Sequence, residues 1–306
     1  GKTLIQQTFD RFCAICPPEN IFIVTNESYV NLVMEQLPSV KRSQVLSEPM
    51  RRNTAPCVAY AASKIYSINH DANLIVAPSD HVIKDENSFK EAVTKGLSFT
   101  ASGDFLLTIG IQPSRPDTGY GYIQFEEEDK KDTNNISRVK TFTEKPNLDM
   151  AKFFLKSGEF LWNAGIFLWR ADSVLRAFET HLPDMYQLFK EDEKCYGTPE
   201  EADVIKRVYE KCTNISIDYG IMEKAKNVYV LSAEFGWSDL GTWKSLYEEL
   251  PHDEAGNAVV GPHVMLDKTN NCIVNLPKDK LAVIQGLENY IVVLSGDVLL
   301  ICPKDD

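Results

Sequence analysis

Apolar and polar positions follow a helical period in some stretches of the chain and form short continuous apolar runs in others. Leu4, Phe9 and Phe12 recur at helical spacing and predict a first helix over residues 3–14. The same period predicts further helices over 27–37, from Asn53 through 65, and over 86–101, 148–157, 171–180, 184–191 and 199–211. Apolar runs predict strands over 21–24, 44–47, 73–77, 105–110, 163–169 and 228–231. Strands and helices therefore alternate through most of the chain.

The strands in this alternation are apolar throughout, which is typical of strands buried on both faces of a sheet. We therefore expect an α/β fold with a mostly parallel, Rossmann-like sheet and helices on both of its faces. Two longer strands are expected over 119–125 and 137–142, separated by a charged loop over 126–135. Because ligands of such sheets bind at the carboxyl ends of the strands, functional residues are expected at that edge.

The end of the chain, residues 251–306, shows no helical period. Turn-forming residues are dense from Pro251 to Pro262, and five short apolar strands are expected over 259–260, 272–274, 281–284, 290–294 and 298–301. The pattern therefore predicts a large domain over 1–250 and a small all-β domain over 251–306. It leaves a short β-helix and a sandwich as alternatives for the small domain.

The charge balance excludes some classes of partner. With 32 basic and 44 acidic residues the net charge is −12, whereas nucleic-acid tracks and anionic membrane surfaces are bound by basic patches. No apolar run approaches the ~20 residues that a membrane span needs. A nucleotide ligand is still compatible with this balance, since a few local cations and a metal ion can hold it.

The cysteines indicate a reducing environment. There are seven, an odd number, and they lie in or beside apolar segments rather than at the spacing of a disulfide framework. We therefore expect a cytoplasmic protein. Cys13 and Cys16 fit a C-x-x-C pattern, but no second pair stands at zinc-like spacing, so packing at a helix end is favoured over a metal or redox site.

Two aspartates and one lysine are the candidates for chemistry. Asp80 follows the apolar run 73–77, and Asp239 follows the strand expected over 228–231. Two carboxylates that meet at strand ends can hold a hard divalent cation, and the cation can hold a triphosphate. Lys145 ends a further strand and would bring an ammonium group to the same edge. This combination suggests phosphoryl or nucleotidyl transfer to a sugar phosphate.

Six segments together resemble the sugar nucleotidyltransferases, most closely the mannose-1-phosphate guanylyltransferases. They are EPMRRNTAP (48–56), PSDHVI (78–83), TGYGYI (118–123), FTEKP (142–146), WNAGIF (162–167) and WSDLGTW (237–243). Each segment alone is weakly specific, but their common order is strong and the resemblance covers essentially the whole chain. It implies a nucleotidyltransferase sheet followed by a small left-handed β-helix. The implied reaction joins GTP and mannose 1-phosphate to give GDP-mannose and pyrophosphate.

The resemblance also implies roles for particular residues. Asp80 and Asp239 would bind magnesium, and Lys145 would align the sugar phosphate. Glu144 would accept hydrogen bonds from sugar hydroxyls. The remaining substrate contacts would come from Glu48, Asn53, Thr54, Gly121 and Asn163. Family members also carry an amino-terminal glycine-rich loop that wraps the triphosphate. The printed sequence begins after that loop, so turnover is expected to depend on it.

Several of these residues also have purely structural interpretations. Asp80 fits a turn or a helix cap, and Glu144-Lys145 fits a solvated charge pair. His81 could orient Asp80 or cap the segment that follows. No catalytic role is expected for it, because a phosphate oxygen is already an anionic nucleophile.

The remaining positions carry similar alternatives. Asn53 fits a helix N-cap, Asn163 fits a turn at the start of a strand, and Asp218 fits a helix cap with a smaller chance of lining the sugar pocket.

Two other classes of function stay open. A glycosyltransferase would also use a metal-bound carboxylate and a nucleotide sugar, but it usually carries an Asp-x-Asp element, which is absent at 78–83. A regulatory subunit would bind the nucleotide sugar without turnover. The sequence leaves the oligomeric state open, with a homodimer through exposed edges of the β domain as one candidate.

Overall fold

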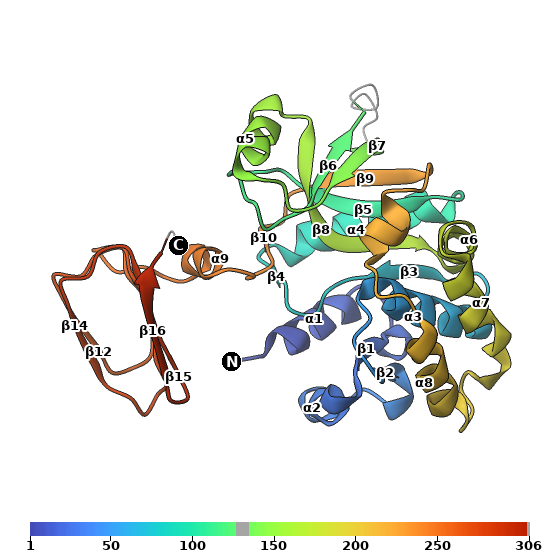
Figure 1. The fold of residues 1–306 in the computed structure, drawn as a ribbon, viewed down its shortest axis with the longest axis horizontal. Helices are drawn as coiled ribbons and strands as arrows, with labels where there is room; N and C mark the ends of the chain where they lie inside the picture. The colour runs from blue at the N-terminus through green and yellow to red at the C-terminus, as the bar shows by residue number, and fades with distance from the viewer. Residues whose placement is uncertain (127–134, 305–306) are drawn as a thin grey trace. The chain divides into compact units, whose positions relative to one another are not determined.

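The computed structural model describes residues 1–126 and 135–304, in two compact units, Gly1–Trp237 and Ser238–Asp306 (Figure 1). The sequence pattern predicts the division near residue 250. The observed boundary lies earlier because the helix α9 (Trp243–Glu249) belongs to the small unit. Leu246 and Tyr247 of α9 pack against Ala258 and Ile273. The charged loop expected over 126–135 falls largely on 127–134, outside the described residues.

The helices of the first unit follow the helical period of the sequence. Local signals set their ends: Asn53 caps α3, Asn147 accepts a hydrogen bond from the Met150 N–H at the start of α5, and Gly158 ends α5 with φ 71°. The α-helices are α1 (Leu4–Cys13), α2 (Val30–Gln36), α3 (Thr54–Ile68), α4 (Glu86–Ala101), α5 (Leu148–Ser157), α6 (Ala171–His181), α7 (Pro183–Glu191) and α8 (Glu201–Lys211). Residues 27–29 form a separate 3₁₀ turn. The single helix expected over 27–37 is therefore divided into this turn and α2.

A six-stranded sheet forms the centre of the first unit (Figure 1). Its strands, in spatial order, are β3 (Asn73–Val76), β8 (Phe160–Arg170), β5 (Leu106–Ile111), β9 (Val228–Ala233), β7 (Ile136–Thr143) and β6 (Tyr122–Phe125). The strand expected over 119–125 is thus shorter, since it begins at Tyr122. The short strands β4 (Val82–Ile83) and β10 (Trp237–Ser238) lie outside this sheet.

The α/β class is confirmed, but the pairing of strands differs from the expected mostly parallel sheet. Strands β3, β5 and β9 run in one direction, yet β8 lies antiparallel between β3 and β5. Within the six-stranded sheet only the pairing of β5 with β9 is parallel among the described residues. A continuous apolar run indicates that a strand is buried on both faces, but it does not indicate the direction of the strand relative to its neighbours. The sequence pattern therefore could not reveal that β8 is reversed.

Helices cover both faces of the sheet, as the pattern predicts. Alternate residues of one strand enter different cores: Leu106 packs with the helices α3, α6, α7 and α8, whereas Leu107 packs with Phe89 and Val93 of α4. Strand β8 divides in the same way, with Trp169 in the first core and Leu168 in the second. The sheet is therefore buried on both sides.

The first two strands form a separate parallel pair. Strand β1 (Ile23–Asn26) pairs with β2 (Val45–Glu48), and Val45 packs with α1 and α2 in a core of its own. The pair ends at Glu48, the first residue of the EPMRRNTAP segment.

The second unit is a short stack of parallel strands. Strands β11 (Ala258–Val260), β13 (Ile273–Asn275) and β15 (Tyr290–Ser295) pair in parallel, and β12 (Val264–Asp267) pairs in parallel with β14 (Ala282–Gln285). Successive strands alternate between these two parallel sheets, which is the arrangement of a short β-helix. The alternative of a sandwich is therefore wrong. Its left-handed sense stays a prediction. Strand β16 (Val298–Pro303) pairs antiparallel with β15 and ends the stack.

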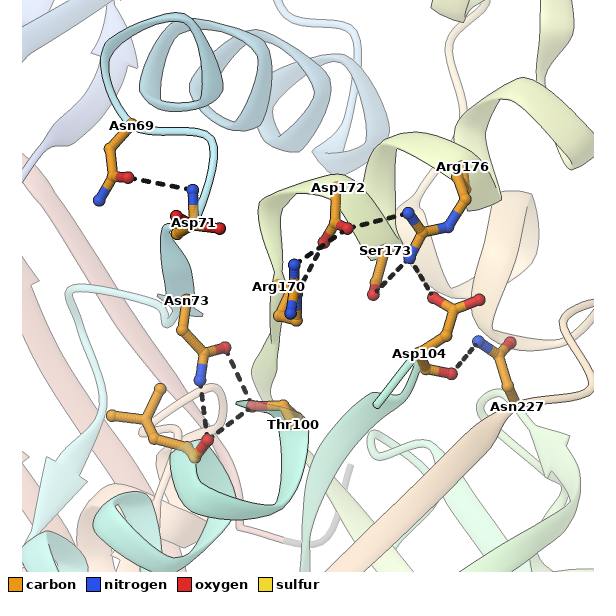
Figure 2. Close-up of polar contacts among 11 residues, drawn as sticks. Asn69, Asp71, Asn73, Thr100, Asp104, Arg170, Asp172, Ser173, Arg176 and Asn227 are labelled. Carbon is orange, nitrogen blue, oxygen red and sulfur yellow. Dashed lines mark hydrogen bonds and ion pairs between the residues drawn. The ribbon is translucent and has the colours of Figure 1, made fainter. Parts of the chain in front are cut away.

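At one edge of the central sheet the polar side chains form separate groups of hydrogen bonds and ion pairs (Figure 2). Asp172 accepts hydrogen bonds from Arg170 and Arg176, and Arg176 also bonds Asp104, which precedes β5. Asn73 at the start of β3 bonds the Leu97 carbonyl and accepts a hydrogen bond from Thr100. The polar groups of this amino-terminal edge bond one another, which favours a stabilising role for it.

The helices in the described ranges are all too short or too polar to cross a membrane.

Candidate functional site

The opposite edge, at the carboxyl ends of β3, β5 and β9, gathers the segments singled out in the sequence. Strand β8 begins at this edge, and Asn163 lies opposite Gly110 near the end of β5. A Cβ at Gly165 would lie 3.7 Å from Pro78 Cγ, so the PSDH segment borders the WNAG segment. The edge that ligands of α/β sheets use therefore holds two of the six segments.

Asn163 is the centre of a hydrogen-bond network at this edge. Its Nδ2 donates to Asp218 Oδ1 at 2.8 Å, and its Oδ1 accepts from Thr108 Oγ1 at 3.1 Å. Its backbone N–H donates to the Gly121 carbonyl at 2.8 Å. The side chain is thus held in one orientation by two distant segments, and a third holds its backbone, which is more than a strand-entry turn requires.

Gly121 and Glu144 approach each other closely. A Cβ at Gly121 would collide with the Glu144 carboxylate and would lie 3.5 Å from Asn163 Cβ. A side chain at this position would require the Glu144 carboxylate to move from its present place. The structure therefore brings Gly121, Glu144 and Asn163 together, and their contact with a substrate stays a prediction.

Two acids at this edge, Asp218 and Glu144, are harder to ionise than exposed acids. Burial raises the pKa of Asp218, although the hydrogen bond from Asn163 opposes the shift. Burial also raises the pKa of Glu144, and the nearby negative charge of Asp218 adds to that effect. Half-buried acids at a sheet edge are suited to accept hydrogen bonds from the hydroxyl groups of a polar ligand.

Glu48 is half-buried at the end of β2 and contacts Tyr209 of α8. Tyr209 Oη donates a hydrogen bond to Glu48 Oε1 at 2.9 Å. Burial raises the pKa of Glu48, and the hydrogen bond from Tyr209 opposes that shift. The backbone nearby is held by Arg52, whose Nε donates to the Tyr209 carbonyl at 3.1 Å.

Asn53 and Thr54 have clear structural roles. Asn53 has φ 67° and its side chain accepts a hydrogen bond from the Thr54 N–H, so it caps α3. Thr54 Oγ1 accepts from the Ile217 N–H at 2.9 Å, one residue before Asp218. The start of α3 is therefore joined to the segment that carries Asp218, and contact of Asn53 or Thr54 with a nucleotide stays a prediction.

Asp80 lies in an exposed turn fixed from both sides. Thr8 of α1 donates to the Ser79 carbonyl at 3.3 Å, and the Asp80 side chain is 74% exposed. His81 follows, and its Nδ1 accepts a hydrogen bond from Trp237 Nε1 at 3.1 Å. The carboxylate is thus presented to solvent from an anchored loop.

The remaining two candidates lie at turns. Lys145 is exposed, follows β7 and has φ 47°. Asp239 belongs to the second unit, where its Oδ1 accepts from the Gly241 N–H at 2.9 Å. Since Asp80 belongs to the first unit, a cation shared by the two aspartates stays a prediction.

The residues at Asp80 fit a magnesium ion that retains most of its own water or phosphate ligands. Over residues 1–126 and 135–304, no three His, Cys, Asp or Glu residues gather as a ready-made metal site. Mg²⁺ is usually held by one or two carboxylates together with substrate phosphates, and an exposed carboxylate such as Asp80 suits that mode.

Sequence reasoning missed several partners of these residues. Thr108 and Tyr209 carry no local signal, and Asp218 fits mainly a cap. Tyr209 lies 161 positions from Glu48, and no local pattern marks such a pair. The long-range pairing of β8 with β5 also brings Thr108 to Asn163.

Comparison with known proteins gives a family for most of the chain. The family described as Nucleotidyl transferase matches residues 1–256. Alginate biosynthesis protein AlgA of Pseudomonas aeruginosa is 35% identical over 99% of this chain and 63% of its own length. Mannose-1-phosphate guanylyltransferase of Escherichia coli is 30% identical over 99% of this chain and 66% of its own length. The chain thus spans just under two thirds of the length of these curated relatives.

Solved structures show the same fold. A Thermus thermophilus protein described as a mannose-1-phosphate geranyltransferase superposes with a TM-score of 0.87 at 28% identity. The match covers 100% of this chain and 86% of that one, so the similarity includes both units.

Proposed function

Because the chain belongs to the nucleotidyl transferase family, we propose that the protein transfers GMP from GTP to mannose 1-phosphate, giving GDP-mannose and pyrophosphate. The names of relatives such as the Escherichia coli enzyme support this choice of substrates. The observation that carries the proposal is the convergence of Gly121, Glu144, Asn163 and Asp218 at the ligand edge of the sheet.

In this proposal an oxygen of the sugar phosphate attacks the α-phosphorus of GTP, and the bond from that phosphorus to the β-phosphate oxygen breaks. The nucleophile is already an anion, so no general base is needed. Glu144, Asn163 and Asp218 would bind the sugar and hold its phosphate in line, since alignment of bound reactants is the main contribution of the protein. Lys145 would pair with the sugar phosphate.

The nucleotide and its cation would occupy the neighbouring segments. Glu48, Asn53 and Thr54 would line the base and ribose, and Asp80 and Asp239 would hold a magnesium ion. When bound, magnesium would offset repulsion among the phosphates and stabilise the charge that develops. We place the protein in the cytoplasm because its seven cysteines are free. A homodimer stays a prediction.

Pyrophosphate release by the full-length protein tests the proposal. Glu144→Gln is expected to raise KM for mannose 1-phosphate by roughly tenfold, because a hydrogen bond to a charged group contributes about 1.5–3 kcal/mol. Arg176→Gln at the opposite edge serves as the control, since Arg176 is half exposed and exposed ion pairs contribute about 0–1 kcal/mol.

The same assay separates the other classes of function. No pyrophosphate from any pair of nucleoside triphosphate and hexose 1-phosphate would remove the proposal. Sugar transfer to an acceptor without pyrophosphate would indicate a glycosyltransferase. Calorimetric binding of GDP-mannose with no turnover would indicate a regulatory subunit.

A further inference from the structure

We propose that His81 is a positioning residue for Asp80, with its ring proton placed by the indole of Trp237. The inference rests on the proposed function, in which Asp80 is a ligand of the cation. It concerns how a single exposed carboxylate can be held in the orientation that the cation needs.

The hydrogen bond between Trp237 and His81 determines where the ring proton lies. Trp237 Nε1 lies 3.1 Å from His81 Nδ1, and an indole N–H can only donate. His81 Nδ1 must therefore be the acceptor and carry no proton. In a neutral imidazole the proton then lies on Nε2, so the ring is the Nε2–H tautomer.

The protonated nitrogen is the one that faces Asp80. His81 Nε2 lies 4.0 Å from Asp80 Oδ1, which is beyond a direct hydrogen bond. The His81 side chain is only 15% exposed, whereas the Asp80 side chain is 74% exposed. The carboxylate is the member of the pair with room to turn, and a turn toward Nε2–H would orient it.

Aromatic packing holds the donor in place. The Trp237 ring meets His81 edge-on, with centroids 5.5 Å apart, and meets Tyr120 at 5.1 Å. Tyr120 in turn packs against Trp162 at 5.0 Å. Together with the bond from Thr8 to the Ser79 carbonyl, these contacts fix both ends of the PSDH segment.

The consequence is a fixed donor for one oxygen of a candidate cation ligand. A hydrogen-bond donor on one carboxylate oxygen leaves the other oxygen for the cation. It also orients the carboxylate before the cation binds, so less conformational entropy is lost on binding. Groups that orient metal ligands commonly change metal affinity or activity by about 10–100-fold when removed. A cap or packing role for His81 would leave metal affinity unchanged.

The tautomer is measured directly by two-bond ¹H–¹⁵N NMR of the histidine rings in the wild-type full-length protein. The chain has five histidines, and His81→Gln assigns the His81 signals by their loss. We expect the Nε2–H pattern for His81 and a mixture of tautomers in Trp237→Phe. An Nδ1–H pattern in the wild type would overturn the proposal.

Metal affinity is measured by the electron paramagnetic resonance signal of free Mn²⁺, with and without the α,β-methylene analogue of GTP. His81→Ala is expected to weaken Mn²⁺ binding by about tenfold. His81→Gln keeps an N–H near the Nε2 position and should regain most of the affinity. The exposed His70→Gln is the matched control, and thermal melts of each variant identify loss of fold.

Unchanged Mn²⁺ affinity in a folded His81→Ala variant would contradict the positioning role. The two proposals fail separately in these measurements. Weaker Mn²⁺ binding without any pyrophosphate release by the wild type would overturn the reaction and support the role of His81.

Discussion

At the scale of single residues, ionised acids at the carboxyl edge of the sheet lower the stability of the folded protein. Asp218 is half-buried and its pKa is raised, so its ionised form destabilises the folded state relative to an exposed acid. Near Asp218 lie Glu144, Glu223 and Tyr219, and no positive group is among the causes of its shift. An acid kept at such a cost favours a functional role.

Asp218→Asn should therefore stabilise the protein and weaken the site. The amide oxygen can still accept from Asn163, while the buried charge is gone. Because the pKa of Asp218 is raised in the folded state, its unfavourable contribution is complete at neutral pH and is lost as the pH falls through that raised pKa. The melting temperature of the variant should exceed that of the wild type at pH 7–8, and the difference should shrink as the pH approaches about 4.

The binding side of this prediction is a loss of roughly tenfold in affinity for mannose 1-phosphate, since the sugar would lose a charged acceptor. Calorimetry on the same samples measures it. A variant that melts lower than the wild type at pH 7–8, or that binds the sugar phosphate as tightly, would contradict this assignment.

Tyr209 provides a test of the role of Glu48. Tyr209→Phe removes the 2.9 Å hydrogen bond and leaves a half-buried carboxylate with one donor fewer. We expect a loss of stability of about 1–3 kcal/mol in urea unfolding. If Glu48 contacts the nucleotide, KM for GTP should rise while KM for mannose 1-phosphate stays close to that of the wild type. Equal changes in both constants would show that Glu48 has no specific part in nucleotide binding.

At the scale of elements, the helices could be predicted from the sequence because each is specified locally. The 16 residues of α4 carry an amphipathic period and an Asp85 cap, and both signals are contained in the segment itself. The place of β8 could not be predicted in this way. Most of its 11 residues are apolar and they face both sides of the sheet, so only the pairing with β3 and β5 fixes its direction.

Helices α3 and α8 are joined by a buried ion pair. Lys64 Nζ lies 2.6 Å from Glu201 Oε1, and the two side chains are 10% and 12% exposed. Burial alone would raise the pKa of Glu201, but hydrogen bonds from Lys64, Tyr60 and the Gly197 N–H outweigh it and lower the pKa. The pair therefore stabilises the fold above the ordinary pKa of a glutamate and loses that effect as the pH falls through the lowered value.

Lys64→Met should destabilise the protein by about 3–5 kcal/mol, because it leaves a buried carboxylate without its cation. The double variant Lys64→Met with Glu201→Gln should recover part of that loss, since both charges are then absent and the amide oxygen can still accept from Tyr60. Denaturant unfolding at pH 7 measures both. A single variant as stable as the wild type would contradict the account of this pair.

At the scale of the whole molecule, the sequence motifs name candidate site residues but not the residues that hold them in place. Gly121, Glu144 and Asn163 were identified by resemblance, and the fold brings them together. Thr108 and Asp218, the partners of the Asn163 side chain, each lie 55 positions from it in the chain, and only the folded structure reveals them. Long-range pairs of this kind leave no period or spacing in the sequence.

The most direct test of the proposed reaction follows the oxygen atoms. Mannose 1-phosphate labelled with ¹⁸O in its phosphate group is incubated with GTP, Mg²⁺ and the full-length protein, and the products are examined by ³¹P NMR. We predict GDP-mannose with ¹⁸O in the bridge between its two phosphorus atoms, and unlabelled pyrophosphate. Absence of GDP-mannose, or label in the pyrophosphate, would contradict attack of the sugar phosphate on the α-phosphorus.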